Sequence, residues 1–399
     1  ITGTPLPNER QISVRVTVMD IKKPVTRPKN ACFSSGPCAK NPIFDVSKLA
    51  KAPLGRSHRA KIGKAKLKLA IEETRKILEI PNDYKIAIVP ASDTGAVELA
   101  MWSMLGARPA TMVAWESFGA GWTNDVVKQL KIEAKICNAD YGEIVDMQTL
   151  DYDTDIVFTW NGTTSGVCLK DGKAIPNNRL GLTICDATSA AFAMELPWEK
   201  LDVTTFSWQK VLGGEAAHGM LILSPRAVER LENYTPAWPL PKIFRLTKNR
   251  KLIESIFEGA TINTPSMLAV EDYLLSLEWA KTIGGKSELI KRAERNAKAI
   301  WDFCDHRNWI ENLAVNPYTR STTSVCLKFK DRRINDGRLF AKNIAKRLED
   351  EKVAYDIEAY RDAPPGLRIW CGSTVETSNI EKMLPWIDWA FHQEIKISS

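Results

Sequence analysis

Residues 204–215 read Thr-Thr-Phe-Ser-Trp-Gln-Lys-Val-Leu-Gly-Gly-Glu. The β-branched and aromatic residues 203–206 predict a short strand that leads to Lys210, and the Gly213-Gly214 pair predicts a sharp turn after it. Large apolar neighbours remove water from a lysine amine, which lowers its pKa and makes it a nucleophile. The neighbours here are Phe206, Trp208 and Val211. A surface lysine in an ordinary turn is the alternative interpretation.

Buried strands and helices alternate along the chain on both sides of this stretch. Apolar runs at residues 84–90, 111–115, 155–160 and 182–185 predict strands, and helical periodicity is found at residues 62–78 and 96–105. This alternation predicts an α/β fold with a mainly parallel sheet covered by helices. Ligand sites of such sheets lie in the loops at the carboxyl ends of the strands.

The sequence after residue 265 predicts a second, smaller unit. Helical patterns cover residues 266–280, 292–303, 337–352 and 380–391, and residues 324–329 alternate as a strand. Because 399 residues are too many for one small core, we expect more than one domain. We divide the chain into an N-terminal arm (1–30), a large domain (31–270) and a small C-terminal α+β domain (271–399). Residues 12–18 of the arm alternate like an edge strand.

Composition excludes several classes of protein. The chain has no run of about 18 apolar residues and no secretory signal, so we expect a cytoplasmic protein without membrane contact. The eight cysteines include no Cys-x-x-Cys pair, and only four histidines accompany them. We therefore expect no metal site and no disulfide, only reduced core thiols.

The net charge of +7 is spread over the chain, with 48 acidic residues interspersed. Its densest basic stretch, residues 56–68, is either a solvated helix face or a positive field that draws a small anionic substrate, and we place nucleic acid behind both.

Two turns have groups that suit an anion. Ser57-His58-Arg59 stands at the entry to the helix of residues 62–78, where backbone donors and an arginine fork converge. Residues 91–95 join a strand to an apolar helix, so that Thr94 and Gly95 lie at a helix N-terminus that favours a phosphate. A capping turn and an ordinary strand-to-helix connection are the respective alternatives.

Asp186 ends one predicted strand, and Lys210 follows the next one. In a doubly wound sheet both open into one crevice. Pyridoxal phosphate requires such a pair, because the lysine binds its carbonyl carbon and the carboxylate keeps its pyridine nitrogen protonated. Phe118, in a glycine-rich loop after another strand, either stacks on a planar ring or, as the alternative, simply packs against its neighbours. An aspartate at a strand end is otherwise a helix cap or a partner for loop donors.

The motifs of this chain resemble those of the phosphoserine aminotransferases, a class V family of fold-type I enzymes that depend on pyridoxal phosphate. The resemblance extends from about residue 31 to the C-terminus. Its motifs are Ser34-Ser35-Gly36-Pro37, Ser57-His58-Arg59, Asp186-Ala187-Thr188-Ser189, Ser207-Trp208-Gln209-Lys210, Asn263-Thr264-Pro265, Tyr360-Arg361 and Leu367-Arg368-Ile369.

The resemblance implies how the cofactor is held. Lys210 would form the Schiff base, and Asp186 would bind the pyridine nitrogen. Thr94, Gly95 and Gln209 would bind the phosphate, and Thr163 would lie near the ring hydroxyl. Phe118 would cover the ring, with Trp122, one helical turn on, as the competing candidate. Asn263 and Thr264 would reach the cofactor phosphate of the neighbouring subunit of a homodimer.

The resemblance also implies how substrates are bound. Arg368 would clamp the α-carboxylate, because an arginine fork matches carboxylate geometry. His58 and Arg59, assisted by Arg361, would bind the phosphate of phosphoserine or the side-chain carboxylate of glutamate. The chain departs from many relatives at Tyr360, where they have histidine, and in the loop that holds Pro364-Pro365, which is longer by a residue than in some.

We thus expect a phosphoserine aminotransferase that exchanges an amino group between L-glutamate and 3-phosphohydroxypyruvate in serine biosynthesis, with pyridoxine biosynthesis as a second role. The alternatives are an aminotransferase of the alanine or serine–glyoxylate type and, from another class, a non-catalytic protein that binds pyridoxal phosphate or nucleic acid. A cysteine desulfurase is disfavoured, because its cysteine requires a flexible loop and Cys326 lies in a predicted strand.

Overall fold

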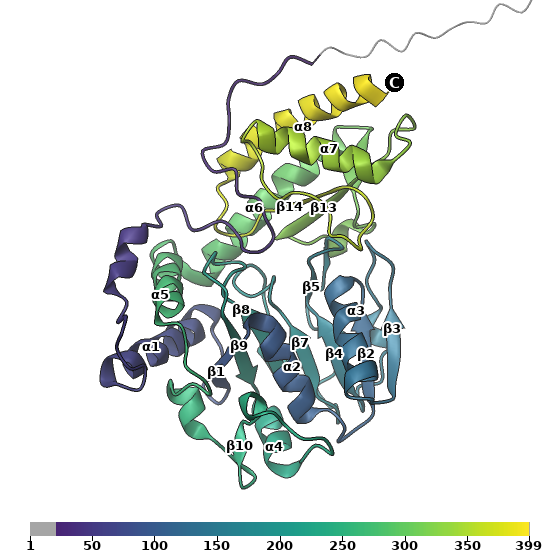
Figure 1. Cartoon of the computed structure of the whole chain (residues 1–399). Helices are drawn as coiled ribbons and strands as arrows, with labels where there is room; N and C mark the ends of the chain where they lie inside the picture. The colour runs from purple at the N-terminus through teal and green to yellow at the C-terminus, as the bar shows by residue number, and fades with distance from the viewer. Residues whose placement is uncertain (1–20, 399) are drawn as a thin grey trace, which may run out of the picture.

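The computed structural model describes residues 21–398, and a seven-stranded sheet forms its lower part in Figure 1. The strand order is β1-β9-β8-β7-β4-β2-β3. The strands are β1 (Lys85–Pro90), β2 (Ala110–Ala114), β3 (Ala134–Asn138), β4 (Asp155–Thr159), β7 (Thr183–Asp186), β8 (Val203–Ser207) and β9 (His218–Leu223). From β8 to β3 every pair is parallel, and β9 is antiparallel to both of its neighbours. The predicted mainly parallel sheet is therefore confirmed, with β9 as the reversed strand.

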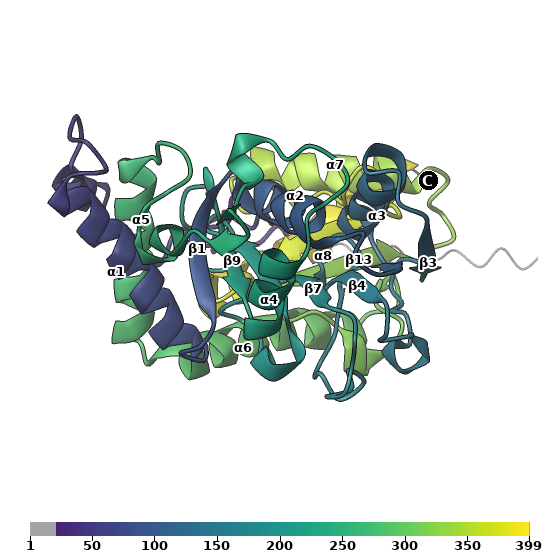
Figure 2. The same cartoon turned by 90° about the horizontal axis from the view of Figure 1, so that it is seen from below.

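Apolar side chains bury both faces of this sheet. In β1, Ile86 and Ile88 pack into one apolar cluster, whereas Ala87 and Val89 pack into another. Alternate residues of a strand point to opposite faces, so each cluster lies on one face. Figure 2 shows α2 and α3 on one side of the sheet, with α1 and α5 next to the β1 edge. The strands read as continuous apolar runs because helices cover both faces.

Some helices begin and end close to the predicted positions, but α6 begins seven residues before its predicted start at 292, α8 continues seven residues past its predicted end at 391, and α2 differs in an informative way. The helices are α1 (Lys61–Leu78), α2 (Ser92–Met104), α3 (Ser117–Asn124), α4 (Pro225–Asn233), α5 (Met267–Thr282), α6 (Gly285–Asp305), α7 (Gly337–Asp350) and α8 (Thr377–Ser398). The sequence predicts that the second helix begins at residue 96, but α2 begins at Ser92. Ser, Asp, Thr and Gly are weak helix formers, which hid the first turn. Thr94 and Gly95 thus belong to the helix itself.

A three-stranded antiparallel sheet forms the second layer of the molecule. It consists of β12 (Ile310–Asn312), β13 (Ser324–Phe329) and β14 (Leu367–Trp370) in that order, and α6, α7 and α8 pack around it in the upper part of Figure 1. The short hairpins β5 (Asn161–Gly162)–β6 (Val167–Cys168) and β10 (Thr247–Lys248)–β11 (Lys251–Leu252) complete the strands. The expected division after residue 270 falls inside α5 and stays a prediction.

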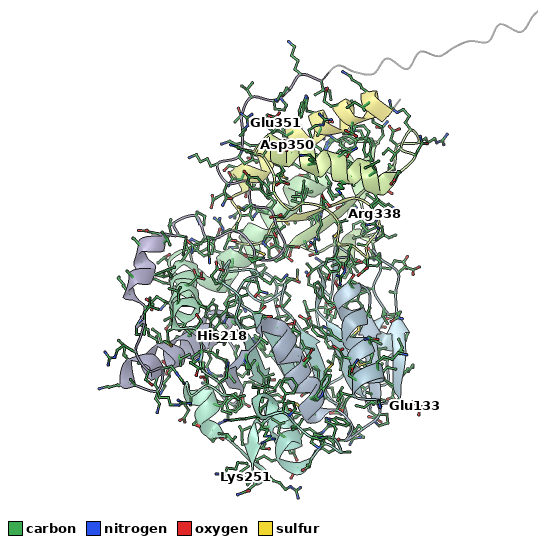
Figure 3. The ribbon with its side chains drawn as sticks, in the orientation of Figure 1. Glu133, His218, Lys251, Arg338, Asp350 and Glu351 are labelled. Carbon is green, nitrogen blue, oxygen red and sulfur yellow. The ribbon has the colours of Figure 1, made fainter. Side chains whose placement is uncertain are left out.

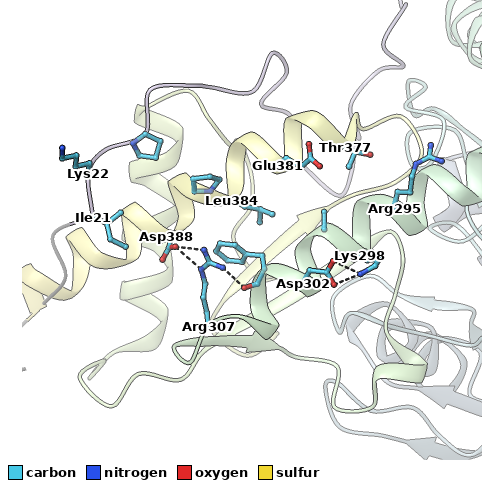
Figure 4. Close-up of a pocket in the computed structure, with 14 residues that line it drawn as sticks. Ile21, Lys22, Arg295, Lys298, Asp302, Arg307, Thr377, Glu381, Leu384 and Asp388 are labelled. Carbon is cyan, nitrogen blue, oxygen red and sulfur yellow. Dashed lines mark hydrogen bonds and ion pairs between the residues drawn. The ribbon is translucent and has the colours of Figure 1, made fainter. Parts of the chain in front are cut away.

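Residues 21–30 run along the small unit. The Trp386 indole donates to the Thr26 carbonyl at 2.8 Å, and Arg27 pairs with Glu351 at 3.0 Å. Figure 4 shows the groove between α6 and α8 beside this segment, where the Arg307–Asp388 and Lys298–Asp302 ion pairs lie. The predicted edge strand at residues 12–18 lies outside the described residues.

All eight cysteines are unpaired, and six of them are buried. The expectation of core thiols is wrong for Cys32, which is exposed: its backbone bridges Tyr355 at the edge of the fold, and its side chain faces outward. Within residues 21–398, no helix combines the length and apolar character needed to cross a membrane.

Asp202 is the polar centre that joins β7, β8 and α4. Its side chain is 1% exposed, and its carboxylate accepts hydrogen bonds from Arg179, from Arg226 at 2.8 Å and from the Ser224 hydroxyl at 3.1 Å. The Arg179 side chain is itself only 3% exposed. Loss of the carboxylate would leave that guanidinium buried without a counter-charge.

We expect Asp202→Ala to lower the free energy of unfolding by about 3–5 kcal/mol, because an unpaired buried charge remains. The control is Asp350→Ala, which breaks the exposed ion pair with Lys346 and should lower it by about 0–1 kcal/mol. Urea denaturation of both variants measures the difference. Equal losses would contradict the central role of Asp202.

Candidate active site

Lys210 follows β8 at the carboxyl end of the strand and is half-buried among apolar side chains. The predicted apolar neighbours are buried, with Trp208 1% exposed. The Lys210 Nζ donates to the Ser35 carbonyl at 2.6 Å and forms no ion pair with any residue from 21 to 398. Burial lowers the pKa of the amine, and the positive charge of Arg368 lowers it further. A methyl group added at Gly36 would stand 2.5 Å from Nζ, so only glycine fits there.

Asp186 is the last residue of β7, which pairs with β8 in parallel register. Its Oδ2 accepts from the Trp122 indole at 3.1 Å, and its Oδ1 accepts from the Thr188 N–H at 2.9 Å. Burial raises the pKa of Asp186, whereas these donors lower it. The two residues expected to face one crevice therefore end neighbouring strands, and Trp122 is committed to the aspartate.

Asp93 is a residue that sequence reasoning missed. It lies in the first turn of α2, is 6% exposed, and stands within hydrogen-bonding range of Asp186. Burial and the neighbouring Asp186 charge raise the pKa of Asp93 well above its usual range. The sequence did contain a signal for Asp93. An acidic residue lies in a turn that is predicted to bind a phosphate, and the two negative charges would repel one another.

The N-terminus of α2 presents backbone donors. Its cap residue Ala91 has no side chain that could accept from the first N–H groups. The Ser92 N–H is bonded to the Ala217 carbonyl at 3.4 Å, whereas the N–H groups of Asp93 and Thr94 have no acceptor among residues 21–398 and stay available to a ligand. A Cβ at Gly95 would overlap the carbonyl of Pro90, which explains the glycine. Thr94 is exposed beside it.

Gln209 and Thr163 line the same region. The Gln209 side-chain oxygen is buried and has no partner within the described chain, while its carbonyl accepts from the Cys38 N–H at 2.8 Å. The Thr163 hydroxyl lies 2.6 Å from that of Ser189, and the Thr163 carbonyl accepts from Ser324 of β13 at 2.6 Å. Thr163 thus joins the large sheet to the small one.

Tyr360 stands among three residues with predicted roles. Its ring centroid lies 5.5 Å from that of Phe118, and the guanidinium groups of Arg361 and Arg368 each lie 5.5 Å from the tyrosine ring. Arg368 is half-buried in β14, and its Nε has no hydrogen-bond partner among residues 21–398. Arg361 is exposed and pairs with Asp362.

A side chain of α7 holds the loop that follows Tyr360. Arg338, labelled in Figure 3, donates to the carbonyls of Arg361 at 3.2 Å and of Ala363 at 3.1 Å. The backbone of the proline-containing loop is therefore anchored, whereas the Arg361 side chain stays in solvent.

Four predicted site residues make no polar contact with the active-site candidates of the same chain. In the described part of the chain, no hydrogen bond or ion pair joins His58, Arg59, Asn263 or Thr264 to Lys210, Asp186 or Arg368. His58 is 8% exposed, and burial lowers its pKa. Arg59 and Thr264 are exposed.

Two further residues that were not predicted from the sequence contact the lysine loop, residues 208–217, or the segment next to it. His218, which lies inward in Figure 3, accepts from the Ser266 N–H at 3.0 Å and contacts the Trp208 ring at 5.1 Å. Asp272 of α5 accepts from Lys40 at 3.0 Å and from the Glu215 N–H at 2.6 Å. Both contact residues that are distant in the sequence, so no local sequence pattern predicts these contacts.

The residues present fit pyridoxal phosphate. The amine of Lys210 has no counter-charge, Gln209 Oε1 and Arg368 Nε lack partners, and α2 offers free N–H groups. These groups match a carbonyl carbon, an anionic ligand and a phosphate, and the Asp186 carboxylate matches a protonated ring nitrogen.

Comparison with known proteins adds an independent finding. No family model matches the chain. The chain is 57% identical to the phosphoserine aminotransferase of Methanosarcina barkeri over 93% of its own length and 99% of that protein. Among solved structures, it is similar to a phosphoserine aminotransferase from Cytophaga hutchinsonii (TM-score 0.76, 20% identity, 89% of this chain and 97% of that one). It is also similar to the pyridoxal-phosphate-bound phosphoserine aminotransferase from Trichomonas vaginalis (TM-score 0.73, 16% identity, 90% and 100%).

Glu116 caps α3, the helix of Phe118 and Trp122, and is 4% exposed. Its carboxylate accepts from the Gly119 N–H at 2.8 Å and from the Thr164 hydroxyl at 2.9 Å. Burial raises the pKa of Glu116 to about 7. The folded state therefore holds a proton that the unfolded state has already lost, so stability falls as the pH rises through about 7.

We expect the wild-type protein to lose more stability than Glu116→Gln between about pH 5 and pH 8, by up to about 3 kcal/mol, because glutamine does not titrate. Urea denaturation at the two pH values measures this. Glu133→Gln, at an exposed position labelled in Figure 3, is the control and should follow the wild type. Parallel pH profiles for wild type and Glu116→Gln would refute a raised pKa.

Proposed function

The chain belongs to the phosphoserine aminotransferase family, and from this we propose that it transfers an amino group from L-glutamate to 3-phosphohydroxypyruvate, giving O-phospho-L-serine and 2-oxoglutarate in serine biosynthesis. The observation that carries the proposal is the arrangement of Lys210 between the Asp186 carboxylate and the unpartnered Arg368. A half-buried amine without a counter-charge is available as a nucleophile. A nearby guanidinium suits the α-carboxylate that both amino acids share.

The cofactor would be held by residues on both sides of the crevice. Thr94 and Gly95, with Gln209, would bind the phosphate, and the Asp186 carboxylate would accept a hydrogen bond from the protonated ring nitrogen. Pyridoxal phosphate supplies, when bound, a conjugated ring that accepts the electrons released at the substrate Cα. The Lys210 Nζ holds and moves the Cα proton, since its lowered pKa lets it act as a base. Thr163 lies near the ring hydroxyl.

Ring coverage would fall to Phe118. Trp122 on the same helix already donates its indole N–H to Asp186, so it orients the aspartate. The Phe118 side chain has no hydrogen-bonding group, and within residues 21–398 the one aromatic ring that it contacts is that of Tyr360. This division of roles supports Phe118 over Trp122 as the stacking residue.

A second copy of the chain would complete the site. His58, Arg59, Asn263 and Thr264 make no polar contact with their own Lys210, which leaves them available to the site of another subunit. The segment ahead of α1 also exposes large apolar side chains, namely Ile43 (61%), Val46 (69%) and Leu54 (62%). Contiguous exposed apolar residues mark protein interfaces. We therefore infer a homodimer with shared active sites, in which Arg361 assists Arg59 at the phosphate.

Two further properties follow from the same site. The arginines would bind a phosphate and an α-carboxylate but would not contact the atoms between these two groups. The phosphorylated hydroxythreonine of pyridoxine synthesis would therefore also fit. Turnover with that compound measures this second role, and its absence would limit the enzyme to serine synthesis. The unpaired cysteines support a reducing compartment such as the cytoplasm.

The spectrum of the protein with pyridoxal phosphate tests cofactor, lysine and substrate together. We expect the absorbance of the lysine-bound cofactor to convert to that of the pyridoxamine form with phosphoserine, but not with serine or alanine. Lys210→Ala should lack the initial band, because it has no amine to bind the cofactor. Conversion by alanine or serine instead would assign the chain to the glyoxylate-type aminotransferases. A shift of a nucleic-acid probe without conversion would favour the non-catalytic alternative.

Mixing two inactive variants tests the shared site. If Arg59 serves the neighbouring subunit, a dimer of Lys210→Ala and Arg59→Ala chains has one intact site and one doubly damaged site. Random mixing then restores about a quarter of wild-type activity, because half of the dimers are mixed. If Arg59 serves its own subunit, both sites of the mixed dimer are damaged and no activity returns. Steady-state rates before and after refolding the mixture distinguish the two.

A further inference from the structure

Asp93 is a buried acid for which the proposed chemistry has no use so far. It is 6% exposed, its Oδ1 is buried, and that atom receives no hydrogen bond from residues 21–398. Neither lysine nor arginine pairs with it in the same residues. A carboxylate kept from water without an ion-pair partner is strongly disfavoured relative to the neutral acid, and burial outweighs the Thr205 hydroxyl of β8, which favours the anion of Asp93.

The neighbour of Asp93 is another acid. Asp186 lies within hydrogen-bonding range from the end of β7 and receives two N–H donors, from Trp122 and Thr188. Two adjacent carboxyl groups in a dry site cannot both ionise, so the pair retains one proton. The donors stabilise the anion on Asp186, which leaves the proton on Asp93.

Other charges around Asp93 do not reverse this distribution. Lys210, beyond the end of β8, favours the anion on both acids, and the Cys185 thiol of β7 is neutral because burial raises its pKa. The N-terminus of α2 favours an anion by only about 0.3–2 kcal/mol. That contribution is smaller than the combined effect of burial and a second carboxylate on adjacent atoms.

A neutral Asp93 would serve both ends of the cofactor. It precedes Thr94 and Gly95, and an anion there would repel a phosphate bound at the N-terminus of α2. On the other side it can donate its proton to Asp186 and fix the orientation of that carboxylate. The same hydrogen bond favours the ionised form of Asp186.

We propose that Asp93 is a positioning residue, a protonated carboxylic acid that donates a hydrogen bond to Asp186 and keeps it an oriented anion toward the ring nitrogen of pyridoxal phosphate. The proton stays on Asp93, and no net transfer occurs between the two acids. This inference rests on the proposed function, because it takes Asp186 as the partner of the cofactor nitrogen.

Infrared spectra of the protein without cofactor test the protonation directly. The measurement uses the Glu116→Gln background at about pH 8, so that Glu116, whose pKa is about 7, does not contribute. We expect the carbonyl absorption of a buried carboxylic acid, which Asp93→Asn removes and which Asp153→Asn, at an exposed position, retains. An absorption that survives Asp93→Asn would overturn the proposal.

The affinity of the apoprotein for pyridoxal phosphate tests the positioning role. Asp93→Asn keeps a neutral donor and should bind within about 3-fold of wild type, whereas Asp93→Ala loses the donor to an anion and should bind about 10- to 100-fold more weakly. Equal weakening in both variants would refute the hydrogen bond. If the wild type binds no pyridoxal phosphate, the proposed function fails, and the infrared result still decides whether Asp93 is protonated.

Discussion

A half-buried lysine amine with apolar neighbours and no carboxylate partner is the constraint on which the proposed site depends. Lys210 and Asp186 end neighbouring strands, yet each is held by neutral groups: a backbone carbonyl for the amine, and an indole and a backbone N–H for the carboxylate. If the two had formed an ion pair, the charges would have neutralised one another and left nothing for a ligand. The parallel β7–β8 pair sets both groups at one edge and keeps them apart.

The same logic extends to the acids around the crevice. Three buried carboxyl groups, Asp93, Glu116 and Asp186, lie within a few residues of strand ends, and burial raises the pKa of each. Asp186 and Glu116 each accept two hydrogen bonds, whereas the buried Oδ1 of Asp93 receives none from residues 21–398, and burial favours the neutral form of all three acids. The protein thus concentrates acidic side chains where an anionic ligand would bind while leaving the crevice with little negative charge, and the positive charge of Arg368 stays unopposed.

The fold was predictable from the sequence because its strands are apolar on both faces and its helices repeat every 3.6 residues. Lys210 and Asp186 were predicted as site residues because each lies at or after the end of a strand, where site residues of such sheets gather, whereas the role of Thr163 was predicted from the family resemblance. Asp93, His218 and Asp272 were missed because their roles arise from contacts between distant segments. The antiparallel strand β9 was not predicted for a similar reason. The sequence of the preceding loop, residues 211–217, does not indicate in which direction the next strand runs. The proposed roles of His58, Arg59, Asn263 and Thr264 involve a second subunit, which no local sequence pattern indicates.

The contacts of Asp272 have a consequence for how the protein is made. The loop after Lys210 is closed by a residue 57 positions further along, through the Glu215 N–H, and the lysine itself bonds to a carbonyl 175 positions earlier. Such long-range contacts form late in folding. A ribosome that has released the chain only as far as Gly259 has delivered Lys210, Asp93, Asp186 and α2, yet not Asp272, which holds the loop after Lys210. Maturation of the crevice therefore waits for α5 to emerge.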